Sequence, residues 1–139
     1  MPLVLDASVA CKWFIQDERT ARADAVLDRI ERGDPAYVPA LFVWEIANVL
    51  LSAERSGRIE SPDVEEALEA LRDAPISVEP AGERVSGAVE LQLARAYDLT
   101  VYDAAYLVTA FNVRGDLATA DSQLAAAARD LGIATIELV

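Results

Sequence analysis

The chain has 139 residues, 53% of them hydrophobic, which suits a single domain spanning residues 1–139 with a sizeable core and excludes a disordered chain. Its formal net charge of −12 argues against sequence-independent binding of nucleic acid through a broad basic face, but it allows a nucleic-acid substrate held through metal ions or a cationic protein partner. The absence of histidine excludes Ser-His-Asp and Cys-His nucleophiles, imidazole bases and ordinary zinc sites.

Short apolar runs alternate with amphipathic segments along the chain, and residues that favour helix ends separate them. Ser8 is expected to cap the first helix, Gly33 to follow the end of the second, and Pro39 to begin the third. Ser61 followed by Pro62 predicts the start of the fourth helix. The expected strands cover residues 2–5, 36–38, 76–78, 117–119 and 133–136, and the expected helices cover residues 8–15, 20–32, 39–55, 61–73, 81–97, 103–113 and 122–131.

This order of elements predicts an α/β fold, an α/β/α sandwich with a short-stranded, mostly parallel central sheet. We expect no membrane span, because no apolar run is long enough, and no signal peptide, because Asp6 interrupts the apolar start of the chain. The single cysteine, Cys11, fits a reducing cytosol and is expected to be a small buried residue. Trp13 and Trp44 are expected to lie in the core.

Four carboxylates interrupt the apolar framework. Asp6 directly follows the first strand, and Asp121 follows the strand at residues 117–119. Asp103 lies in the first turn of its helix, whereas Glu45 lies about a turn and a half into the third helix, with Asn48 on the same face. Ligands of such sheets collect beyond the carboxyl ends of the strands. We therefore expect the four acids to converge there around Mg²⁺ or Mn²⁺, which prefer oxygen ligands.

Each acid also has a purely structural explanation. Asp6 and Asp121 are both placed to cap the helix that follows them, and Asp103 is placed to stabilise a helix N-terminus electrostatically. Glu45 is explained by a position at the rim of the core from which its side chain reaches solvent. The coincidence of all four favours a metal site. Because like charges would lie close together, at least one of the four is expected to have a raised pKa in the absence of metal.

The segments around these acids resemble motifs of the PIN-domain family and, within it, of the VapC-type toxin ribonucleases. The resemblance covers essentially the whole chain, and the segments occur in the family's order and near its spacings. No acidic position departs from the pattern. The matching segments are Leu5-Asp6-Ala7-Ser8 with Lys12-Trp13-Phe14, then Trp44-Glu45-Ile46-Ala47-Asn48, Tyr102-Asp103-Ala104-Ala105-Tyr106 and Thr119-Ala120-Asp121.

The resemblance implies a metal-dependent endoribonuclease, the toxin of a type II toxin–antitoxin system, that hydrolyses RNA such as tRNA or rRNA with Mg²⁺ or Mn²⁺. It also implies a cytoplasmic homodimer and a cognate antitoxin whose basic C-terminal segment covers the site. Asp6 and Asp103 are implied to be the most direct metal ligands of the acidic cluster. The full implied set comprises the catalytic and metal-binding acids Asp6, Glu45, Asp103 and Asp121 and the supporting residues Ser8, Asn48 and Thr119.

Phosphodiester hydrolysis fits such a site independently of the resemblance, since one or two divalent ions can activate water, neutralise charge and assist the leaving oxygen. A metal-dependent phosphatase would require a second aspartate where the chain has Asp6-Ala7-Ser8. A phospho-acceptor receiver domain would require a lysine at the end of a late strand, yet Lys12 is the only lysine. A catalytically silent PIN-like module that binds RNA or protein remains the alternative, and the sequence does not separate it from an active nuclease.

Overall fold

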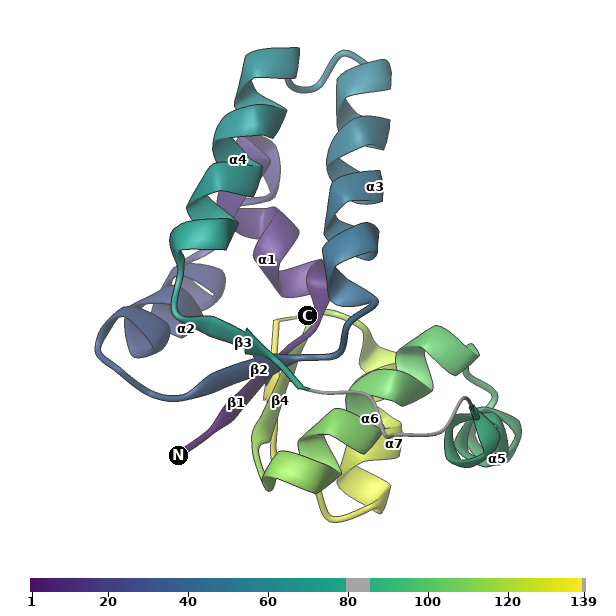
Figure 1. The fold of residues 1–139 in the computed structure, drawn as a ribbon. Helices are drawn as coiled ribbons and strands as arrows, with labels where there is room; N and C mark the ends of the chain where they lie inside the picture. Colours follow the sequence, from purple (N-terminus) through teal and green to yellow (C-terminus); the bar gives the residue numbers. More distant parts are fainter. Residues whose placement is uncertain (80–85, 139) are drawn as a thin grey trace.

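The structure is a computed structural model that describes residues 1–79 and 86–138. The described strands form one sheet in the order β3-β2-β1-β4-β5, and every neighbouring pair is parallel (Figure 1). The predicted α/β fold is confirmed. The strands are β1 Leu3–Leu5, β2 Ala36–Val38, β3 Ile76–Val78, β4 Asp116–Thr119 and β5 Thr135–Glu137. The helices are α1 Ala7–Phe14, the 3₁₀-helix η1 Gln16–Glu18, α2 Ala21–Glu31, α3 Phe42–Arg55, α4 Ser61–Asp73, α5 Ala88–Tyr97, α6 Val101–Val113 and α7 Ser122–Asp130.

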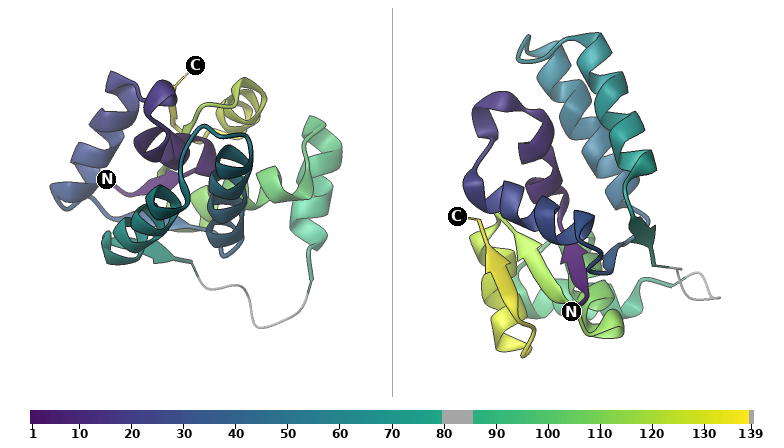
Figure 2. Two further views of the ribbon diagram at one scale, coloured as in Figure 1. Left: turned by 90° about the horizontal axis from the view of Figure 1, so that it is seen from above. Right: turned by 90° about the vertical axis from the view of Figure 1, so that its left-hand side faces the viewer.

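Helices cover both faces of the sheet. Helices α1 to α4 lie on one face and α5 to α7 on the other, as Figures 1 and 2 show from three directions. Helices α3 and α4 form a hairpin that projects away from the sheet. In the described part of the chain, no helix combines the length and the apolarity needed to cross a membrane.

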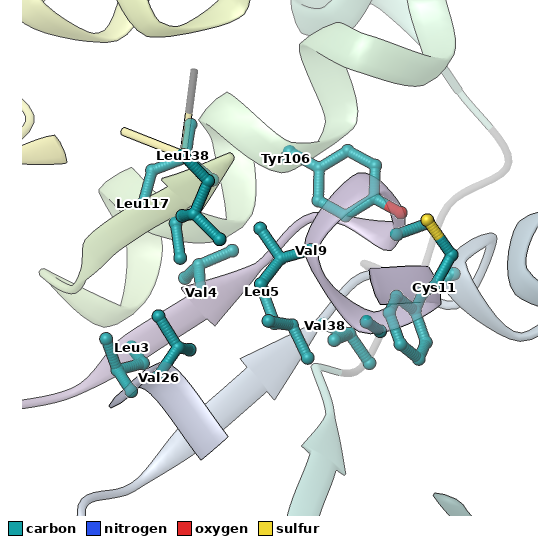
Figure 3. Close-up of a cluster of buried hydrophobic side chains, with 14 of the residues drawn as sticks. Leu3, Val4, Leu5, Val9, Cys11, Val26, Val38, Tyr106, Leu117 and Leu138 are labelled. Atoms are coloured by element: carbon teal, nitrogen blue, oxygen red, sulfur yellow. The ribbon is translucent and has the colours of Figure 1, made fainter. Parts of the chain in front are cut away.

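Strand β1 lies at the centre of the sheet, and its sequence is entirely apolar because helices cover it on both sides. Leu3, Val4 and Leu5 are fully buried. Figure 3 shows them packed among core side chains such as Val9 and Tyr106. The chain runs from β1 outward to β2 and β3, and then returns to the other side of β1 to form β4 and β5. The order of the strands therefore reverses between β1 and β4, which is where open α/β sheets bind their ligands.

Several helices begin at residues other than those predicted. Helix α1 begins at Ala7, so Ser8 lies inside it instead of capping it. Helix α3 begins at Phe42, after a turn that follows Pro39, and Glu45 therefore lies in its first turn. The start expected at residue 81 falls outside the described residues, and the helix that is described begins at Ala88.

A side-chain cap accounts for the early start of α6, whereas α4 begins at Ser61 as predicted but with a different cap. Helix α6 begins at Val101, two residues before the expected start, because the side chain of Thr100 accepts a hydrogen bond from the amide of Asp103. Helix α4 is capped by Glu60, whose own amide donates to the carboxylate of Asp63. The hydroxyl of Ser61 was expected to serve as this cap.

The two tryptophans occupy different environments. Trp13 is buried, and its Nε1 donates to the carbonyl of Ala23 at 2.8 Å. Trp44 is 69% exposed, so the expectation that it lies in the core is wrong. Helix α3 buries Phe42, Ile46 and residues further along the same stripe, which turns position 44 outward.

Candidate active site

Asp6 is the first residue after β1 and is nearly buried, at 7% exposure. It occupies the N-cap position of α1, but its side chain makes no capping hydrogen bond. Instead, its Oδ2 accepts hydrogen bonds from Ser8 Oγ and from Thr119 Oγ1, each at 2.7 Å. Helix capping therefore does not account for this carboxylate.

The two hydroxyls that contact Asp6 are themselves held by the backbone that follows β4. The amide of Ala120 donates to Ser8 Oγ at 3.0 Å, and the amide of Asp121 donates to Thr119 Oγ1 at 3.0 Å. Because each hydroxyl has a single hydrogen, accepting from an amide leaves that hydrogen for Asp6. This network fixes the orientation of Asp6 at the point where the strand order reverses.

Glu45 projects from the first turn of α3 and is partly buried. Its Oε1 accepts a hydrogen bond of 2.5 Å from the hydroxyl of Tyr106 on α6. Asp103 lies three residues before Tyr106, in the first turn of α6, and is also partly buried. The structure thus brings acids from the end of β1, from α3 and from α6 to the same edge of the sheet.

The pKa values of two acids reflect this arrangement. Burial raises the pKa of Asp6, the hydrogen bonds from Thr119 and Ser8 oppose this, and the charge of Asp103 adds to the rise. Burial also raises the pKa of Glu45. The hydrogen bond from Tyr106 opposes this rise, and the charges of Asp6 and Asp103 add to it. The expected rise in pKa therefore occurs, but burial rather than repulsion is its main cause.

Asp121 and Asn48 are placed differently from the other predicted residues. Oδ1 of Asp121 accepts from the amides of Gln123 and Leu124 at 2.9 and 3.1 Å, so this side chain does cap α7. The backbone amide of Asp121 donates to the hydroxyl of Thr119, which in turn donates to Asp6. Asn48 is exposed on α3, and its side chain makes no hydrogen bond to another described residue.

Comparison with known proteins identifies the fold. The sequence profile of the PIN domain matches residues 3–130. This chain belongs to the PIN domain family. It is 31% identical over 127 residues to Ribonuclease VapC3 of Pyrobaculum aerophilum, covering 90% of this chain and 93% of the relative. The predicted resemblance to the VapC-type members of the family is confirmed.

Solved structures share the fold of this PIN domain. The crystal structure of PAE2754 from Pyrobaculum aerophilum superimposes with a TM-score of 0.74 at 20% sequence identity, covering 98% of this chain and 90% of the other. The crystal structure of FitAcB from Neisseria gonorrhoeae gives a TM-score of 0.64 at 19% identity, covering 96% and 95%.

Among the residues that the structure describes, no basic side chain pairs with the four acids of this PIN domain. Within residues 1–79 and 86–138, however, no group of three or more His, Cys, Asp or Glu side chains is arranged so that it could hold a metal ion. The charge of Asp103 contributes to the raised pKa of Asp6, and the charges of Asp6 and Asp103 contribute to that of Glu45, but the acids do not form a closed set of ligands.

Tyr106 belongs to the site although the sequence pattern did not single it out, and it lies within one of the matching segments. Its spacing of three residues from Asp103 places both on one side of a helix. This spacing is the feature of the sequence that could have indicated that Tyr106 belongs to the site. The partner of its hydroxyl, Glu45, lies 61 residues away in the sequence and is recognisable only in the folded chain.

Proposed function

We propose that this PIN domain is a metal-dependent endoribonuclease, the toxin of a type II toxin–antitoxin system, that acts on RNA in the cytoplasm. The observation that carries the proposal is the environment of Asp6. A buried carboxylate at the reversal of the strand order accepts two oriented hydroxyls, has acidic neighbours and lacks a basic partner among the described residues. Membership of the family and the similarity to Ribonuclease VapC3 support it.

The donor groups at this edge fit a hard divalent cation such as Mg²⁺ or Mn²⁺. Buried charge is costly unless it is paired or binds a metal. Mg²⁺ keeps several waters and uses only one or two carboxylates together with substrate phosphates. A site of that kind does not require three preformed protein ligands, which agrees with the open arrangement of Asp6, Glu45 and Asp103. Asp121 is the fourth acid of the proposed site.

The residues of the chain then have separate tasks. Ser8 and Thr119 engage Oδ2 of Asp6, which leaves Oδ1 to face a cation. Glu45 and Asp103 add negative charge from the two helical layers and would bind the cation or its waters. Asn48, exposed on α3, is placed to contact substrate. When bound, the cation supplies activation of water and neutralisation of charge at the scissile phosphate.

A cationic partner protein suits the charge of the chain. An apolar hollow of about 470 Å³ lies between α3, α4 and β3, and Val43, Trp44 and Leu68 contribute exposed side chains to it. We propose that a cognate antitoxin occupies this hollow with apolar side chains while a basic segment reaches the acids. The proposed homodimer rests on the family resemblance alone.

RNA cleavage tests the proposal directly. Purified protein is incubated with structured RNAs, tRNA and rRNA first, in Mg²⁺, in Mn²⁺ and in EDTA. Asp6→Asn and Asp103→Asn should abolish cleavage, whereas Asp28→Asn, which removes an exposed carboxylate from α2, should leave it unchanged. Cleavage that persists in EDTA, or that survives both site substitutions, would reject the mechanism. Growth arrest on expression, relieved by Asp6→Asn, tests the toxin role.

The open arrangement of the acids also supports a second candidate, a catalytically silent module that binds RNA or protein through the same fold. The two candidates differ in their response to metal. A silent module binds its partner equally well in EDTA and in Mg²⁺ and leaves every RNA intact. Binding of RNA without cleavage, unchanged by Asp6→Asn, would favour this second candidate.

A further inference from the structure

Tyr106 joins the two helices that carry Asp103 and Glu45. Its side chain is 0% exposed, and its hydroxyl donates to Oε1 of Glu45 at 2.5 Å. Helices α3 and α6 lie on opposite faces of the sheet, so this hydrogen bond crosses from one helical layer to the other beyond the end of β1. Because Asp103 is one turn away on the same helix, Tyr106 ties Glu45 to the element that carries Asp103.

The two partners of this hydrogen bond differ in mobility. A glutamate side chain has several rotatable bonds, and ordering it costs conformational entropy. The ring of Tyr106 is already fixed by its packing in the core, where Figure 3 shows it in the buried cluster that also contains Val9 and Cys11. The hydroxyl therefore holds Oε1 in place and leaves Oε2 available to a ligand. Such outer partners orient metal-binding carboxylates, and their loss typically weakens metal affinity by roughly 10–100-fold.

We propose that Tyr106 is a positioning residue that holds Glu45 at the cation site and sets the affinity of this chain for its divalent ion. The inference rests on the proposed function, since it requires a cation at this edge of the sheet. It adds to that function a residue outside the acidic cluster. Tyr106 acts only through Glu45 and touches neither cation nor substrate.

The chain contains a matched control for this contact. The hydroxyl of Tyr97 on α5 donates to Oδ2 of Asp130 on α7, also at 2.5 Å. Both pairs join a tyrosine to a carboxylate on another helix, but the Tyr97 pair contains none of the proposed site acids. Tyr97→Phe therefore removes the same kind of hydrogen bond without disturbing the proposed site.

The test is divalent-cation affinity measured on metal-free protein, by calorimetry with Mg²⁺ and by electron paramagnetic resonance with Mn²⁺. Tyr106→Phe should weaken binding by roughly 10–100-fold, while Tyr97→Phe should leave it unchanged. In a Glu45→Gln background, Tyr106→Phe should have no further effect, because the carboxylate through which it acts is gone. Thermal unfolding of each metal-free variant establishes that it is folded, and a purely structural role would lower that transition without changing affinity.

Each outcome decides the matter. A folded Tyr106→Phe variant with wild-type affinity, or one whose loss adds to that of Glu45→Gln, overturns the positioning role while leaving the proposed nuclease intact. Wild-type protein that binds neither ion refutes the metal site itself, and the role of Tyr106 with it.

If the Tyr106→Phe variant does not fold, a second measurement tests the inference with Tyr106 left in place. The near-ultraviolet absorbance of tyrosine is followed during Mg²⁺ titration in a Tyr102→Phe background, which removes the exposed tyrosine beside Asp103. A change that requires Glu45, and that is absent after Glu45→Gln, supports the inference. No change in either protein overturns it.

Discussion

Replacing Thr119 by valine tests the hydrogen-bond network that holds Asp6. Thr119 is 0% exposed, and its hydroxyl both donates to Asp6 and accepts from the amide of Asp121. Valine has nearly the same shape but lacks the hydroxyl. The variant therefore loses both hydrogen bonds and deprives the Asp121 amide of its acceptor.

These two losses set the size of the effect. A hydrogen bond to a charged group contributes roughly 1.5–3 kcal/mol, and a buried donor left without a partner costs roughly 1–3 kcal/mol. The additional methyl group offsets about 0.8 kcal/mol of this through burial. We expect the free energy of unfolding at neutral pH to fall by about 2–5 kcal/mol.

Urea unfolding measures this change, with Thr109→Val as the control. Thr109 is also buried, at 2% exposure, but its hydroxyl contacts no carboxylate in the described part of the chain. Thr119 lowers the pKa of Asp6 because it stabilises the ionised form. Its contribution is therefore present above that pKa and is lost as the pH falls through it, so the deficit of Thr119→Val should shrink in acid. Wild-type stability of Thr119→Val at neutral pH, or a deficit independent of pH, contradicts the network.

Three further predictions concern burial and charge. Because burial raises the pKa of Asp6 and Glu45 above their ordinary values of 3.8 and 4.5, the folded metal-free protein binds protons that the unfolded chain has released. Its free energy of unfolding should therefore rise as the pH falls from neutral toward the ordinary pKa values of these carboxyls. Asp6→Asn should reduce this rise, as measured by urea unfolding at several pH values. An unchanged dependence of the free energy of unfolding on pH would contradict this prediction. Burial raises the pKa of the Cys11 thiol to about 11, so a thiol reagent should modify it only after unfolding, and rapid reaction in native buffer is the contrary result. Trp44→Phe leaves only the buried Trp13, whose fluorescence should be blue-shifted and poorly quenched by acrylamide. Trp13→Phe leaves only the exposed Trp44, whose fluorescence should be red-shifted and readily quenched. The reverse pattern would contradict the burial of Trp13 and the exposure of Trp44.

The sequence predicted the strands and the position of Asp6 because both depend on local pattern. The run Leu3–Leu5 is apolar throughout, as a strand covered on both faces must be, and the first charged residue marks its end. Helix α4 begins at Ser61, as predicted, but the residue that caps it was less predictable because competing caps lie close together. Glu60 and Asp63 form a reciprocal cap that overrides the hydroxyl of Ser61, and such competition depends on the geometry of the turn.

The arrangement of the site required the folded chain. The order of the strands decides which strand ends are neighbours, and no local pattern states that β4 pairs with β1. Trp44 faces outward because a different stripe of α3 packs on the core. The residues on both sides of position 44 are apolar, so the sequence alone does not indicate which stripe is buried. The hydrogen bond between Tyr106 and Glu45 depends on two helices that no sequence motif links.

The location of a bound cation would show whether the acids at this edge of the sheet hold a metal ion. Crystals of this chain soaked in Mn²⁺ would reveal the ion in an anomalous difference map without reference to activity. We expect a peak beyond the carboxyl end of β1, close to Oδ1 of Asp6 and to Asp103 or Glu45, directly or through water. A well-occupied ion held by other residues, or no peak at this edge at saturating Mn²⁺, would contradict it.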